Sequence, residues 1–140
     1  MENSELKYWL AFSEINRLGP KRFSFMRKNF PNLEMAWHAS APELLNAGLN
    51  EKIIEELILC RREIKPDDLL TKIEKAEVKA VTVVDPDYPK LLKEIYNPPF
   101  VLYYRGHLAA ANEQTIAVVG TRKVSHYGKR VTQELSLIHI

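Results

Sequence analysis

Apolar side chains recur at helical spacing through residues 4–76, and prolines, glycines and capping residues separate the resulting segments. The pattern predicts helices over the ranges 4–17, 21–30, 32–37, 40–48, 50–64 and from 66 onward. Asn32, Ser40 and Asn50 each stand at the start of such a segment. Their side-chain oxygens can accept hydrogen bonds from first-turn amides, so we expect them to cap these helices.

From Val78 the pattern changes to short β-branched runs broken by proline and glycine. Strands are predicted over residues 78–84, 100–104 and 115–119, with a turn at 85–89 and one or two helical turns over 90–96. The run 115–119 is almost continuously apolar, which is typical of a strand buried on both faces of a parallel sheet. The sequence therefore predicts an α+β or α/β fold: a helical domain, residues 1–76, precedes an α/β domain, residues 77–140.

Aromatic residues of the helical domain stand at helical spacing, and we interpret them as its core rather than as a stacking platform for bases. They are Trp9, Phe12, Phe23, Phe25, Phe30 and Trp37. Tyr88, Tyr103 and Tyr104 are expected to pack the strand–turn–strand unit. Val118 and Val119 are assigned to the core beside the third strand.

The composition excludes several classes of protein. The 140-residue chain contains no stretch that approaches the ~18 apolar residues of a membrane span, and its acidic, polar start is unlike a signal peptide. Cys60 is the single cysteine, which excludes an intramolecular disulfide and a cysteine-rich zinc site. The histidines are scattered without metal-ligand spacing. We therefore expect a cytoplasmic protein without membrane contact, metal or cofactor.

The net charge of +2 is small, but the cations are grouped. One block without an intervening acid contains Arg17, Lys21, Arg22, Arg27 and Lys28. It surrounds Leu18-Gly19-Pro20, a turn that in a helix-hairpin-helix could present backbone amides to phosphate. DNA-binding hairpins usually carry a second glycine where this chain has Lys21, so we prefer a solvated or protein-contacting face. A second basic block contains Arg122, Lys123, Lys129 and Arg130.

The second block lies in a segment where an apolar run ends in Gly120 and a polar loop leads toward a helix. Gly120 would allow a sharp exit from the strand, and Ser125 is a suitable N-cap. First-turn amides carry partial positive charge, so each nearby cation is unfavourable by about 0.3–1 kcal/mol. A bound phosphate would reverse that sign, and the segment therefore predicts an anion site.

The loop differs from the common nucleotide-binding loops. A dinucleotide loop has a second glycine where this chain has Arg122, and no Walker Gly-Lys-Ser/Thr follows. Arginine prevents close backbone approach but supplies a bidentate phosphate donor. The predicted phosphate site comprises Gly120, Thr121, Arg122, Lys123, Ser125, Tyr127, Gly128 and Lys129, and no catalytic residue is predicted. The alternative is that Arg122 forms a structural salt bridge and Tyr127 anchors the core.

Four blocks of this sequence resemble the DNA-processing protein A family, also called DprA or Smf, in family order and spacing. They are the Tyr-Pro block at 87–95, the Pro-Pro…Gly block at 98–106, the Val-Val-Gly-Thr-Arg block at 116–122 and Ser-His-Tyr-Gly at 125–128. The resemblance implies a helical domain of helix-hairpin-helix or SAM-like type and an extended Rossmann-like domain that binds single-stranded DNA without catalysis. It also implies that the protein protects incoming single strands of DNA, loads the recombinase RecA during transformation, and forms a homodimer at full length.

The resemblance also assigns residues to the site. Gly120, Thr121 and Arg122, with Ser125 and Gly128, match the positions of the family's DNA-backbone pocket. Thr121 stands where the family more often has serine, which keeps the hydroxyl. The remaining walls of that pocket are expected beyond residue 140, so we expect the Rossmann-like domain to be truncated here.

Two alternatives stay open. Related Rossmann-like enzymes that hydrolyse nucleotide phosphoribosyl bonds also bind phosphate after a strand-ending glycine. They need acidic catalytic residues and generally lack the helical unit and the Pro98-Pro99 block, so DNA binding is preferred.

Residues 135–140 do not continue the family pattern, and one reading frame of the transposase mosaic-end adapter encodes the same hexapeptide. That tail is either adapter-encoded or an authentic helix end.

Overall fold

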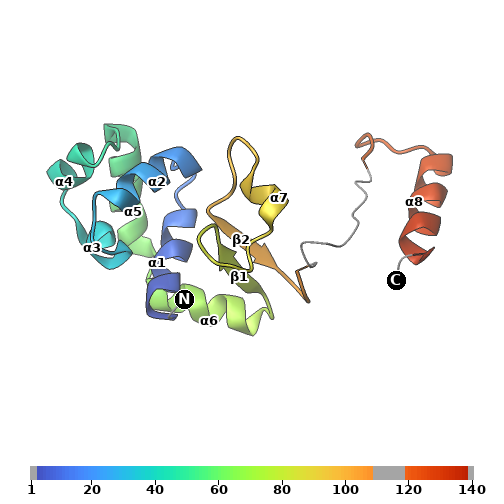
Figure 1. Ribbon diagram of the computed structural model, residues 1–140, viewed down its shortest axis with the longest axis horizontal. Helices are drawn as coiled ribbons and strands as arrows, with labels where there is room; N and C mark the ends of the chain where they lie inside the picture. The colour runs from blue at the N-terminus through green and yellow to red at the C-terminus, as the bar shows by residue number, and fades with distance from the viewer. Residues whose placement is uncertain (1–2, 109–118, 139–140) are drawn as a thin grey trace.

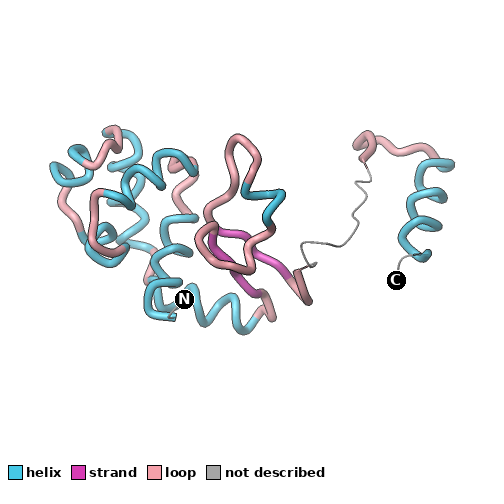
Figure 2. Tube along the Cα trace, in the orientation of Figure 1, coloured by secondary structure: helices cyan, strands magenta, loops and turns pink. Residues whose placement is uncertain are grey.

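A helical unit, a small β-hairpin and one further helix make up the structure, a computed structural model that describes residues 3–108 and 119–138 (Figure 1). The elements are α1 (Asn3–Ser13), α2 (Pro20–Lys28), α3 (Leu33–His38), α4 (Ala41–Asn46), α5 (Glu51–Glu63), α6 (Pro66–Lys75), β1 (Lys79–Thr82), α7 (Lys90–Lys93), β2 (Val101–Tyr104) and α8 (His126–Ile138). Figure 2 shows the helices in cyan and the hairpin in magenta. No helix in the described ranges is both long and apolar enough to cross a membrane.

Polar caps fix the first residues of three helices, as predicted. The side chains of Asn32 and Asn50 accept hydrogen bonds from the amides three residues on, at 2.8 Å and 3.1 Å, and so begin α3 and α5. At α4, the amide and hydroxyl of Ser40 donate to the Glu43 carboxylate at 2.7 Å and 2.6 Å. These bonds favour the ionised carboxylate and lower the pKa of Glu43. The local sequence therefore determines where these helices start.

Helix α1 ends earlier than the apolar pattern predicts. The expected end at residue 17 is wrong, because the helix ends at Ser13, whose hydroxyl donates a 2.7 Å hydrogen bond to the Leu10 carbonyl. Such a bond offers the backbone an alternative to continuing the helix. The chain then turns more tightly, with a 3.2 Å hydrogen bond from the Ile15 amide to the Phe12 carbonyl. Ile15 is thereby kept in the core, where it is 2% exposed.

The two described strands form an antiparallel hairpin, which makes this part of the fold α+β. Strand β1 pairs with β2 in a register that opposes Lys79 to Tyr104 and Thr82 to Val101. The parallel sheet depends on the predicted strand 115–119, and residues 115–118 lie outside the described residues. Val119 is described, is not part of a strand, and is 89% exposed, so its assignment to the core is wrong.

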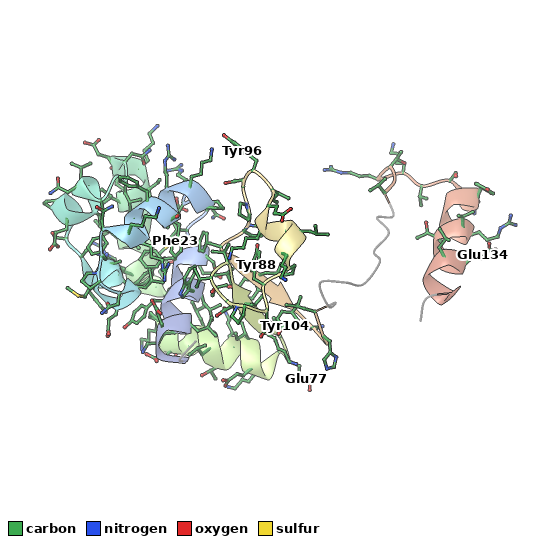
Figure 3. The ribbon with its side chains drawn as sticks, viewed as in Figure 1. Phe23, Glu77, Tyr88, Tyr96, Tyr104 and Glu134 are labelled. Carbon is green, nitrogen blue, oxygen red and sulfur yellow. The ribbon has the colours of Figure 1, made fainter. Side chains whose placement is uncertain are left out.

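The turn after β1 is held by a side chain that the sequence marks as a turn former. The Asp85 carboxylate accepts hydrogen bonds from both the amide and the hydroxyl of Thr82, each at 2.8 Å. Further along, the Tyr88 hydroxyl donates to the Pro99 carbonyl at 2.7 Å. Tyr88 is buried, as predicted, and it ties the first turn to the proline pair before β2 (Figure 3).

The core of the helical unit is aromatic. Trp9, Phe12, Phe23 and Trp37 are buried, as predicted. The assignment of Phe25 to this core is wrong, because its side chain is 57% exposed. Residues 23 and 26 share the buried face of α2, and the helical period turns position 25 to the opposite side.

Phe100 connects the hairpin to this core. Its ring stacks on Phe23 with centroids 4.0 Å apart and planes 11° apart, and it lies 6.4 Å from the Trp9 ring. Helix α1 also contacts β2, and the Ser13 hydroxyl is 2.8 Å from the Tyr103 hydroxyl. The hydrophobic core is therefore continuous across the domain boundary predicted between residues 76 and 77, which stays a prediction.

Replacing Phe100 tests this connection. We expect Phe100→Ala to lower the free energy of unfolding by about 3–5 kcal/mol, because it removes a buried ring and leaves a cavity beside Phe23. The measurement is chemical denaturation followed by circular dichroism. Leu91→Ala is the control: Leu91 is 72% exposed and its loss should cost under about 0.5 kcal/mol. Equal costs for the two variants would contradict a stabilising role of the Phe100 stack.

Candidate nucleic-acid interface

The predicted phosphate-binding residues lie in one loop and in the helix turn that follows it. Gly120, Thr121, Arg122, Lys123 and Ser125 form the loop before α8, and Tyr127, Gly128 and Lys129 belong to its first turns. In Figure 1 this segment and α8 are drawn in orange and red. All of these residues except the half-buried Gly128 are exposed. The structure thus brings the predicted set together on an accessible surface.

Two local hydrogen bonds shape the loop. The Thr121 hydroxyl donates to the Lys123 carbonyl at 2.6 Å, which closes a tight turn around Arg122. The Ser125 hydroxyl accepts a 3.2 Å bond from the Gly128 amide, and the Ser125 carbonyl accepts a 2.9 Å bond from the Lys129 amide. Ser125 is therefore the N-cap of α8, as predicted.

The start of α8 leaves two backbone donors unused. The amides of His126 and Tyr127 have no hydrogen-bond partner among the residues that the structure describes. First-turn amides of a helix carry the positive end of its dipole, and they suit an anion. A helix of 13 residues is long enough to develop this end charge.

Cationic side chains surround these donors. Arg122, Lys123 and Lys129 are exposed, and within the ranges 3–108 and 119–138 none of them forms an ion pair. Arg130 differs, because its Nε lies 3.7 Å from Glu134 Oε1. The alternative of a structural salt bridge at Arg122 therefore finds no partner in the described residues. Three unpaired cations next to a helix N-terminus repel one another and the dipole, which a bound anion would relieve.

Two details differ from the expectations for this loop. Tyr127 is 71% exposed, so the alternative that it anchors a core is wrong; its ring centroid lies 6.0 Å from Arg130 Cζ. Gly120 has no left-handed φ, and a Cβ there would meet nothing within 4 Å, so the backbone does not require glycine at this position. At Gly128, in contrast, a Cβ would lie 3.0 Å from Val124 and 3.4 Å from the Ser125 hydroxyl, so glycine leaves room for the cap.

The arrangement can hold an anion, and nothing in it points to metal binding. In the described part of the chain no group of three or more His, Cys, Asp or Glu side chains could hold a metal ion. Around the loop, backbone amides and the Arg122 guanidinium offer directional donors, while the lysines add point charges. These donors and charges can bind the oxygens of a phosphate group that lies against the loop.

Sequence reasoning recognised the basic block at 17–28, for which a solvated or protein-contacting face was preferred, but it missed the groove that this block borders. The basic block of α2 borders a groove whose other side includes Tyr96, a residue that no motif singled out. The available signal was the pairing of exposed aromatic residues with a block of cations, which is typical of surfaces that bind single-stranded nucleic acids.

The cap at Ser125 can be tested by itself. Ser125→Ala removes the acceptor of the Gly128 amide, and we expect a loss of about 1 kcal/mol in the local stability of α8. Amides of the first turns of α8 should then exchange with solvent roughly fivefold faster. Ser125→Asp keeps an acceptor and should preserve the slow exchange. If the alanine variant exchanged as slowly as the unchanged chain, the cap would not stabilise this helix.

Comparison with known proteins adds independent evidence. A sequence model of the family described as DNA recombination-mediator protein A matches residues 79–138. Protein Smf of Synechocystis sp. is 38% identical over 141 residues, which cover 97% of this chain and 35% of that protein. Protein Smf of Borreliella burgdorferi is 38% identical over 96 residues, covering 63% of this chain and 31% of that protein.

The DNA processing protein DprA of Bacillus subtilis is 26% identical over 121 residues, covering 76% of this chain and 39% of that protein. No solved structure gives a significant match. The chain thus spans about a third of the length of the curated relatives it matches. The family match includes the loop and all of α8, and the Synechocystis relative extends the similarity through the helical unit. The chain therefore belongs to the DprA/Smf family of DNA-processing, recombination-mediator proteins.

Proposed function

We propose that the loop 120–125 and the first turns of α8 bind the backbone phosphates of single-stranded DNA. The observation that carries this proposal is the group of three exposed, unpaired cations, Arg122, Lys123 and Lys129, beside a capped helix N-terminus with two free amides. Family membership supports DNA as the source of the phosphate. Neither the loop nor the family match favours the phosphoribohydrolase alternative.

Each residue has a distinct part in this proposal. Arg122, at the exposed tip of the turn closed by Thr121, is the main phosphate donor, because a guanidinium can hold two phosphate oxygens at once. Lys123 and Lys129 attract the strand without fixed geometry. Tyr127, with its ring 71% exposed, is available to stack on a base.

The site suits a single strand better than a dinucleotide. A dinucleotide pyrophosphate needs a glycine at the position of Arg122, where the backbone has to approach closely. A polynucleotide backbone can instead run across the exposed loop and meet successive donors. The cations are exposed on the turn and on the start of the helix, where a strand could reach them.

The domain types, cellular location and partners implied by the family resemblance extend the proposal to the whole protein. We infer that residues 77–140 open an extended Rossmann-like domain, that residues 1–76 form a helix-hairpin-helix or SAM-like domain, and that the protein acts in the cytoplasm. The full-length protein would protect incoming single strands as a homodimer and load the recombinase RecA on them. The description of the family as a recombination mediator supports this role, which requires binding rather than a catalytic step.

Removing the main donor tests the proposal. We expect Arg122→Ala to weaken binding of single-stranded DNA about tenfold, whatever its sequence, because one charge-assisted contact is lost. The slope of log affinity against log salt should flatten by about 0.7 for the lost phosphate contact. Fluorescence anisotropy with oligonucleotides at several salt concentrations measures both quantities.

Arg62→Ala provides the matched control. Arg62 is an exposed arginine on α5, away from the loop, and it forms no ion pair with the described residues. Its removal changes the net charge by the same amount but should leave affinity and slope nearly unchanged. Equal effects of the two substitutions would show that only overall charge matters, and an unchanged Arg122→Ala would remove this residue from the site.

A further inference from the structure

A groove lies between helix α2 and the hairpin, remote in sequence from the loop before α8. It has a volume of about 400 Å³, within the range of about 300–1,000 Å³ usual for ligand pockets. Lys21, Phe25 and Lys28 of α2 line one side, and Tyr96 with Pro98 lines the other. Rings of the aromatic core, including Trp9, form its inner wall. Tyr96 lies at the outer end of the segment that follows α7 (Figure 3).

Two buried donors on this inner wall have no partner. Trp9 Nε1 and Arg27 Nε are both buried and make no hydrogen bond with the described residues. Trp9 is only 1% exposed, and the Arg27 guanidinium carbon lies 5.1 Å from its ring centroid. Both atoms are shielded from solvent, so they belong to the packed wall behind the groove and not to its open surface.

The charge of the groove has one sign. Its lining includes Lys21, Arg27 and Lys28 and no acidic residue. None of these three cations forms an ion pair in the part of the chain that the structure describes. The groove therefore selects for an anionic occupant, and it does so with point charges at its rim.

Exposed aromatic rings accompany these charges. Tyr96 is 85% exposed and Phe25 is 57% exposed, which leaves two large apolar rings open to solvent at one groove. The Lys21 ammonium lies over the Tyr96 ring, 3.7 Å from its centroid, so one face of the ring holds the cation and a base would stack on the other. Alternating cations and aromatic rings characterise proteins that bind single-stranded nucleic acids, with rings for bases and cations for phosphates.

We propose that this groove holds a nucleotide of single-stranded nucleic acid, with its base on Tyr96 or Phe25 and its phosphate at Lys21 and Lys28. The inference rests on the proposed function for the ligand, since a strand bound at α8 would have a second contact here. An acidic protein segment would satisfy the cations but would leave the exposed rings of Tyr96 and Phe25 without a matching partner. The combination therefore favours a nucleotide.

The test separates base stacking from charge in the full chain. Tyr96→Ala should weaken binding of an oligothymidylate about 12 nucleotides long by between about fivefold and a hundredfold. It should leave binding of an abasic oligonucleotide with the same number of phosphates unchanged. Tyr96→Phe keeps the ring and should bind normally. Lys21→Ala should weaken binding of both probes and lower the salt slope by about 0.7.

Arg22→Ala is the matched charge control, because Arg22 is exposed on the same helix but does not line the groove. It should weaken binding much less than Lys21→Ala. Photocrosslinking of 5-iodouracil oligonucleotides to the unchanged chain gives a second readout that needs no variant. Adducts should map to Tyr96 or Phe25, and their absence there would overturn the proposal.

The outcomes also distinguish the groove from the loop. If Arg122→Ala has no effect while Tyr96→Ala weakens binding of the base-bearing probe, the loop proposal fails and the groove stands. If only Arg122→Ala has an effect, the groove proposal is overturned. If a polyglutamate peptide binds in a Lys21-dependent manner and the oligonucleotides ignore Tyr96→Ala, the occupant is an acidic protein segment, which also overturns it.

Discussion

The stacking of Phe100 on Phe23 is the contact on which the arrangement of residues 3–108 depends. It joins a hairpin of two four-residue strands, too small to be stable alone, to the aromatic core of the helical unit. The same contact places the segment that carries Tyr96 opposite α2, and so creates the groove. One buried ring thereby serves both stability and the shape of a surface. The proline pair before Phe100, bonded through Pro99 to Tyr88, limits how far that segment can move.

Helix starts were predictable because their determinants are local. Asn32 and Asn50 each accept a hydrogen bond from an amide three residues on, and Ser125 does the same for α8. Ser40 instead donates to the Glu43 carboxylate, which lies three residues on. The ends of helices and the exposure of individual side chains were harder to predict from the sequence. The end of α1 depends on a hydroxyl that bonds to its own backbone, and apolar character alone could not show that Phe25 faces outward.

The two candidate binding surfaces also differ in how far they could be predicted from the sequence. The loop before α8 is contiguous in sequence, so its cations and its cap could be recognised together. The groove brings residues 21–28 next to residues 96–98, and that proximity exists only in the folded chain. Neither basic block is paired with acids in the described residues, apart from Arg17 with Glu56 and Arg130 with Glu134. The unpaired cations are concentrated on two surfaces, so these surfaces can attract an anionic ligand although the net charge of the chain is small.

Single-stranded DNA is proposed to be held through the loop before α8, with a second contact in the groove. The most direct measurement is the change in backbone amide NMR shifts as an unlabelled oligothymidylate is added to the isotope-labelled chain. The perturbed amides should cluster at residues 120–130, with a second group at residues 21–28 and 96–98. Saturating shifts confined to other surfaces, such as α4 and α5, or no shifts at all, would contradict it.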